Sequence, residues 1–120
     1  WAPDVDNDAS REFVEAFDER YGYIPGVYAM FGYDTAMLLD AAVAAVEGDL
    51  ADTDAFAAAI EAAEFTSLRG DFRFNNNHFP VQDFYLLEVA EREDGRFQTT
   101  IAERVFDDYA DAYHDDCGME

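Results

Sequence analysis

The hydrophobic pattern of the chain changes once, close to residue 70. Before this point apolar residues recur every three or four positions, as they do on one face of a helix. After it, segments such as 71–74 alternate apolar and polar residues, which is the period of a strand. A chain of 120 residues has room for one domain with a real core. The pattern predicts an α/β chain of three helices, a short strand and a β-hairpin.

Capping residues set the expected limits of the helices. The first helix is expected at about 8–21, the second at about 27–47, and the third from about residue 53. Polar residues suited to an N-cap precede the first and third helices, and glycines follow the first two. These residues are, in chain order, Asn7 or Asp8, Gly22, Gly48, and Asp52 or Thr53.

The strands are expected between clusters of turn residues. A short strand at 71–74 is followed by an asparagine turn at 75–77. The apolar run at 84–89 predicts a buried strand, and residues 93–96 predict the hairpin turn. The strand returns over 97–105.

The acidic tail at 106–120 is expected to lie outside the folded segment 1–105, with Phe106, Tyr109 and Tyr113 at roughly helical spacing. Three helices and a small sheet leave one sheet face and two edges uncovered. The second helix also carries apolar residues on more than one side. We therefore expect that part of the structure lies outside this chain.

The charge of the chain excludes several partners. The sequence has 28 acidic residues against seven arginines and no lysine, which gives a net charge of -21. Such a chain repels nucleic-acid phosphates and anionic membrane surfaces. No run approaches the roughly 20 apolar residues that span a bilayer. Cys117 is the single cysteine, so no disulfide within the chain is expected.

The segment at residues 28–36, Tyr-Ala-Met-Phe-Gly-Tyr-Asp-Thr-Ala, resembles a motif of the type I periplasmic binding proteins of the leucine/isoleucine/valine-binding group. Phe13 to Phe17, then Tyr21-Gly22 and Pro25, resemble the helix and turn that precede this motif. The segment 70–75 resembles the family's next strand, and residues 77–86 resemble the turn and long strand after it. Each motif alone is weak, but their order and spacing are specific.

The resemblance implies the C-terminal part of a two-lobed, Rossmann-like receptor that delivers solutes to an ABC importer. Such receptors are usually about three times longer than this chain and close their lobes over a ligand, a hinge motion. The implied partners are a small ligand, either an amino acid or an aromatic or aliphatic carboxylate, and the permease subunits. A periplasmic or other extracytoplasmic location follows, with a signal peptide upstream of Trp1. No cofactor is expected.

Three residues are candidates for ligand contact. Tyr28 stands at the start of the second helix, where the resemblance implies an aromatic side chain near the cleft. A tyrosine offers a flat apolar face and one hydroxyl, which suits an amino acid or an aromatic acid. Phe31 and Trp1 are weaker candidates, since packing in a core or interface explains both.

Metal and catalytic sites have little support. The acidic residues Asp4, Asp6, Asp8 and Glu15 match calcium-loop spacing, but Ala9 replaces the glycine that the loop needs. His78 is expected to be a hydrogen-bonded turn residue. The His114 to Cys117 cluster lacks a second set of ligands. No nucleophile elbow or phosphate loop is present, so the chain is not expected to be an enzyme.

The function that the sequence favours is therefore solute binding for an ABC importer of branched-chain amino acids or related small carboxylates. Two alternatives stay open. One is a ligand-sensing domain of a receptor with the same fold. The other is a stand-alone acidic interaction domain that forms a homodimer to cover its apolar faces.

Overall fold

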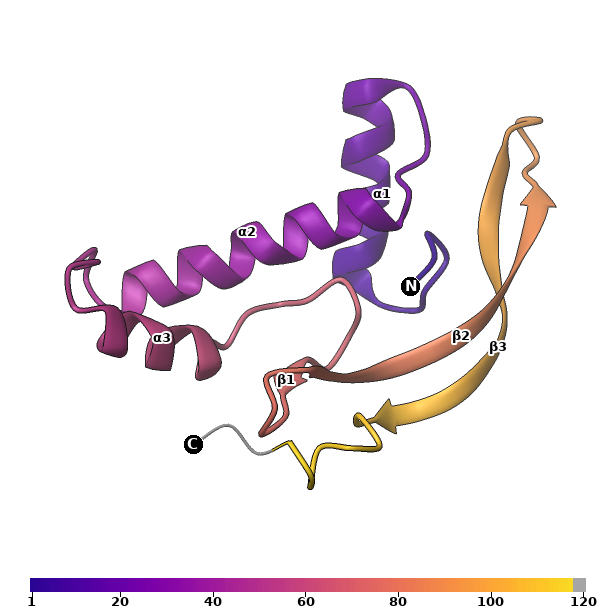
Figure 1. The fold of residues 1–120 in the computed structure, drawn as a ribbon. Coiled ribbons are helices and arrows are strands. Elements are labelled where there is room, and N and C mark those ends of the chain that lie inside the picture. The colour runs from indigo at the N-terminus through magenta and orange to yellow at the C-terminus, as the bar shows by residue number, and fades with distance from the viewer. Residues whose placement is uncertain (118–120) are drawn as a thin grey trace.

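A computed structural model describes residues 1–117 of the chain. It contains three helices followed by three strands, as the sequence predicts (Figure 1). The last residues of the expected tail, 118–120, lie outside the described residues. The elements are α1 (Asp8–Tyr21), α2 (Val27–Ala45), α3 (Thr53–Glu61), β1 (Arg73–Phe74), β2 (Pro80–Glu91) and β3 (Phe97–Tyr109).

The helix limits follow from their caps. The Asn7 side chain accepts a hydrogen bond of 2.7 Å from the backbone N–H of Ser10, and the Asp52 side chain accepts one of 3.0 Å from Ala55. These bonds satisfy N–H groups that have no partner within the helix. Gly22 ends α1 in the left-handed conformation at φ 76°, which a residue without a Cβ adopts at little cost. The predicted caps at Asn7, Gly22 and Asp52 are confirmed.

Helix α2 ends at Ala45, before the predicted Glu47. Val46 leaves the helical conformation, and both Glu47 and Gly48 take positive φ values of 53° and 80°. α3 then lies beside the C-terminal end of α2, while α1 crosses near its other end (Figure 1). No helix among residues 1–117 has the length and apolar character needed to span a membrane.

The three strands form one antiparallel sheet in the order β1–β2–β3. β2 and β3 form a long twisted hairpin whose pairing runs from Glu91 opposite Phe97 to Gln82 opposite Tyr109. Register shifts interrupt the pairing near Phe84 and between Leu86 and Leu87, and such bulges increase the local twist. The hairpin extends away from α2 and α3, with its tip on the side of α1 (Figure 1).

A small core forms where the N-terminal segment, α2 and the loop after α3 meet. Met30 and Leu68 are its largest fully buried apolar side chains. The other buried apolar residues are Ala2, Pro3, Val5, Pro25, Ala42 and Val81. The molecule is flat, with extents of 50 × 34 × 18 Å, so few side chains lie deep inside it.

Two predictions about the hairpin are wrong. The strand at 84–89 is not buried: most of its side chains face solvent, and Val89 is 71% exposed. Within residues 1–117 no layer covers the hairpin faces, so apolar residues suited to a sheet interior remain accessible. In addition, β3 continues past Val105 to Tyr109, where the Phe106 and Tyr109 rings contact each other and Phe84 at centroid distances of 5.0–6.5 Å. Phe106 and Tyr109 therefore lie on a strand, contrary to their helical spacing.

Candidate functional site

Asp34 is a buried carboxylate at the middle of the molecule. It lies on α2 and is only 2% exposed. It accepts three hydrogen bonds, from Ser67 Oγ at 2.6 Å, from the Leu68 backbone N–H at 2.9 Å and from Arg69 Nε at 2.9 Å. A buried carboxylate is stable only when its oxygens are paired in this way. Asp34 therefore fixes the loop after α3 to helix α2.

Arg69 extends this network to the sheet. Its Nη1 donates a hydrogen bond of 3.0 Å to Gln82 Oε1 on β2, while its Nε remains paired with Asp34. Its guanidinium carbon lies 4.5 Å from the ring centroid of Phe72 and 5.7 Å from that of Phe31. One arginine thus contacts α2, β2 and two aromatic rings.

The start of α1 is tied to the same loop. The Asn7 amide donates a hydrogen bond of 3.0 Å to the Leu68 carbonyl, while its side-chain oxygen caps α1. Trp1 Nε1 donates a hydrogen bond of 2.9 Å to the buried Ser10 hydroxyl. The N-terminal segment, α1, α2 and β2 therefore meet at residues 67–69.

Two of the candidate ligand residues share one face of α2. Tyr28 is 86% exposed and Phe31 is 43% exposed. They are three residues apart, so their side chains are neighbours on the helix surface. Gly26, the N-cap of α2, supplies no side-chain hydrogen bond, and the first turn contains no acidic residue. This end of α2 therefore presents accessible aromatic groups beside backbone N–H groups.

Trp1, the third candidate, lies elsewhere. Its ring meets the Phe13 ring edge-on at a centroid distance of 6.4 Å, and its indole nitrogen is engaged by Ser10. The structure gives it a packing contact with α1, whereas Tyr28 and Phe31 belong to α2. The structure therefore brings two of the three candidates together on α2 and places the third in the N-terminal segment, packed against α1.

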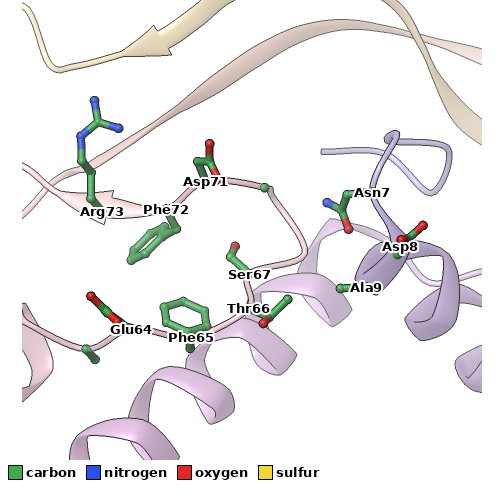
Figure 2. A pocket seen from close by; sticks show the side chains of 12 residues that line it. Asn7, Asp8, Ala9, Glu64, Phe65, Thr66, Ser67, Asp71, Phe72 and Arg73 are labelled. Carbon is green, nitrogen blue, oxygen red and sulfur yellow. The ribbon is translucent and has the colours of Figure 1, made fainter.

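A pocket of about 670 Å³ opens between the start of α1 and the segment 63–73 (Figure 2). The Phe65 and Phe72 rings pack side by side in it at 5.2 Å, and Ser67 lies near its centre. Three carboxylates, Asp8, Glu64 and Asp71, line it against the single arginine Arg73. This lining repels an anionic ligand, and the pocket contains neither Tyr28 nor Phe31.

A second pocket, of about 680 Å³, lies where the N-terminal segment meets the hairpin. Burial disfavours ionisation of Asp83, yet hydrogen bonds from the Asp108 backbone, Arg104 and Tyr85 hold the pKa of its carboxyl below the usual value. Burial and the hydrogen bond to Asp83 raise the pKa of Tyr85 to about 12. These pairs stabilise the base of the hairpin and leave the pocket acidic.

The acidic N-terminal segment is held by other contacts. Arg11 pairs with Asp6 at 2.9 Å and also with Asp8, while Asp4 accepts a hydrogen bond from the Ile101 backbone N–H. Across residues 1–117 no three potential ligands gather in a metal-binding arrangement. Asp6 and Asp8 of the calcium-like spacing therefore pair with Arg11, Asp4 bonds to the Ile101 backbone, and the cap of α1 is Asn7.

The remaining polar candidates lie at the surface. His78 occupies a turn at φ 59°, where its backbone N–H bonds to the Asn75 carbonyl and its Nε2 lies 3.1 Å from Glu61. It is the hydrogen-bonded turn residue that the sequence predicts. Cys117 is a free, exposed thiol, and His114 lies 3.3 Å from its neighbour Asp115.

Sequence reasoning missed the roles of Asp34 and Arg69. A signal for Asp34 was present, because it is the only charged residue between Arg20 and Asp40, within an apolar helix. A lone charge in such a stretch indicates a buried polar contact. No comparable signal marks Arg69, because its partners are 35 and 13 residues away along the chain.

The periplasmic binding protein family model matches residues 1–96 of the chain. No match was found among curated protein sequences. Among solved structures, a solute-binding protein of an ABC transporter from R. palustris, in complex with benzoate, is 38% identical, with a TM-score of 0.81. That alignment covers 93% of this chain and 30% of the other.

Two further solved structures agree with this match. An ABC transporter substrate-binding protein from Sphaerobacter thermophilus is 33% identical over 90% of this chain, with a TM-score of 0.76. A solute-binding protein from Rhodopseudomonas palustris BisB5, in complex with 3,4-dihydroxybenzoic acid, is 27% identical over 93% of this chain, with a TM-score of 0.79. This chain spans 30% of the length of each.

These proteins bind solutes and are not enzymes, in agreement with the class that the sequence favours. The matched region includes the segment 28–36, on which the resemblance rests, and all three helices. The helices, the short strand and the hairpin together form a fragment of the same α/β fold. The chain belongs to the periplasmic binding protein family.

Proposed function

We propose that this chain is the C-terminal segment of a solute-binding receptor that delivers a small carboxylate to an ABC importer. The observation that carries the proposal is the likeness to the benzoate-bound R. palustris protein, at 38% identity over 93% of this chain. In the proposed mechanism two lobes close over the ligand, and the permease subunits recognise the closed form. The receptor acts outside the cytoplasm, with a signal peptide upstream of Trp1.

The proposed ligand is an aromatic carboxylate, with a branched-chain amino acid as the second candidate. Two of the structurally similar proteins are in complex with benzoate and 3,4-dihydroxybenzoic acid. Tyr28 and Phe31 offer aromatic surface to a planar ring. The adjoining N-terminus of α2 favours a negative group, because its first N–H groups have no side-chain cap.

Calorimetric titration of the full receptor with benzoate and with leucine tests this proposal. We expect saturable binding of benzoate and a weaker or absent response to leucine. Tyr28→Ala is expected to weaken benzoate binding, while Tyr113→Ala, at another exposed tyrosine, leaves it unchanged. Tight leucine binding without benzoate binding would reverse the order of the two ligands. Binding of neither would contradict the proposed function.

A homodimeric interaction domain is the second candidate, and the exposed hairpin favours it. Phe84, Leu86 and Leu87 are each more than a third exposed, although isolated proteins seldom leave such patches uncovered. Light scattering of the 1–120 chain separates the two functions. A stable dimer with a cooperative melt supports the interaction domain. A chain that associates without a defined stoichiometry supports a segment whose partner surfaces belong to the rest of a receptor.

A further inference from the structure

Phe31 contacts the guanidinium of an arginine that other residues hold in place. The Arg69 guanidinium carbon lies over its ring at 5.7 Å from the centroid, and Phe31 remains 43% exposed. The ring therefore has an accessible surface and a second surface in contact with the guanidinium. A cation over an aromatic ring is attracted by the electrons of the ring, so this contact restricts where the ring can lie.

Arg69 is itself held from two directions. Its Nε is paired with the buried Asp34 at 2.9 Å, and its Nη1 is bonded to Gln82 at 3.0 Å. Asp34 stands on α2, one helical turn after Phe31, whereas Gln82 stands on β2. The Arg69 side chain is only 13% exposed, so solvent screens these contacts weakly. The guanidinium consequently occupies one fixed place between helix and strand.

We infer that Arg69 is a positioning residue of the ligand site. It holds the Phe31 ring in the orientation that receives the ligand and links that ring to β2 through Gln82. Arg69 need not touch the ligand to do this. The inference rests on the proposed function, because it assigns Phe31 to the ligand site of the receptor.

The chemistry of the side chain makes the inference specific to arginine. A guanidinium is planar and carries separate donors, so it can bond to Asp34 and Gln82 while its face lies over a ring. A lysine keeps the charge and can pair with Asp34, but it lacks the planar face and the second fixed donor. Arg69→Lys therefore preserves the buried charge pair and removes the contacts that orient Phe31.

The test is calorimetric titration of the full receptor with benzoate, together with its melting temperature. We expect Arg69→Lys to weaken benzoate binding by about tenfold, which corresponds to ~1.4 kcal/mol, while the protein remains folded at the titration temperature. The matched control is Arg73→Lys, since Arg73 lies nearby in the chain and pairs with Asp108 at the surface. We expect the control to bind benzoate as the wild type does.

A double-mutant cycle separates positioning from simple stability. If Arg69 acts through Phe31, Arg69→Lys should cost little further affinity once Phe31→Ala is present. Independent, additive losses would overturn the inference, as would wild-type affinity in folded Arg69→Lys. If the wild-type receptor binds neither benzoate nor leucine, the proposed function fails and the positioning role fails with it. If the wild type binds benzoate but the Arg69→Lys results contradict the inference, only the positioning role fails.

Discussion

The helical region and the β2–β3 hairpin use similar residues in opposite ways. In the helical region a few apolar side chains are fully buried around Met30 and Leu68, and the charged pair Asp34–Arg69 lies among them. The hairpin also carries large apolar residues, but most of them, such as Phe84, Leu86 and Val89, are exposed, and its ion pair between Asp108 and Arg73 lies at the surface. The helical region thus contains its own core, whereas the hairpin presents surfaces that suit contact with other parts of a receptor.

The largest expected difference between the two regions concerns buried and exposed carboxylates. Asp34→Asn should lower the free energy of unfolding by about 3–5 kcal/mol, because it leaves the buried Arg69 without its charge partner. Asp108→Asn, which breaks the exposed pair with Arg73, should cost no more than about 1 kcal/mol. Urea unfolding of the full receptor measures both. Equal losses would show that the Asp34 network is no more important than a surface pair.

The next largest effect concerns apolar side chains. Leu68 is fully buried, so Leu68→Ala should cost about 2–5 kcal/mol. Leu86 is 56% exposed, and Leu86→Ala should cost less than about 1 kcal/mol in the 1–120 chain. Urea unfolding followed by circular dichroism compares them. If the full receptor covers the hairpin, Leu86→Ala should lower the free energy of unfolding of the full receptor by nearly as much as Leu68→Ala does. An unchanged small loss would mean that this face of the hairpin stays open to solvent.

A smaller effect is expected at the helix caps. Asn7→Ala should lower stability by about 1–2 kcal/mol, because it removes both the α1 cap and the bond to the Leu68 carbonyl. Asp52→Ala removes only the cap of α3 and should cost about 0.5–1 kcal/mol. The comparison uses melting temperatures of the two variants. Equal shifts in melting temperature would indicate that the hydrogen bond from Asn7 to the Leu68 carbonyl adds no stability beyond that of the cap.

The smallest effect concerns the contact between α1 and the hairpin tip. Arg96 donates hydrogen bonds to Asp18 at 2.6 and 2.7 Å and to Asp94 at 2.8 Å. These bonds lower the pKa of Asp18 below 3.8 and that of Asp94 to about 2. A depressed carboxyl pKa stabilises the fold above the unfolded value, and this stabilisation disappears as the pH falls from about 4 toward about 2.

Arg96→Gln should therefore lower the melting temperature slightly at pH 7, and the difference from wild type should shrink steadily as the pH falls from about 4 toward about 2. Melting curves at several pH values, with Arg73→Gln as a surface control, measure this. A difference that is as large at pH 2 as at pH 7 would mean that Arg96 acts through packing rather than through the two carboxylates.

The local features of this protein were determined by its sequence alone. The N-caps at Asn7 and Asp52, the left-handed Gly22 and the hairpin turn at 93–96 depend on the conformational preferences of single residues and their near neighbours. The change of hydrophobic period separated helices from strands, because each period follows from the local geometry of one element. The segment 28–36 resembles a motif of the family that the chain belongs to, and Tyr28 and Phe31 lie on one helix face because they are three residues apart.

The tertiary structure decided what depends on distant contacts. Periodicity predicted a buried strand at 84–89, but burial requires a covering layer, and no element of residues 1–117 supplies one. Phe106 and Tyr109 have helical spacing in the sequence, but both residues pair with β2 as part of a strand. Such pairing depends on a partner strand elsewhere in the chain. The network of Asp34, Arg69 and Gln82 joins residues up to 48 positions apart (34 to 82). Only the folded chain brings these groups within hydrogen-bonding distance. A pattern of neighbouring residues in the sequence could therefore not predict this network.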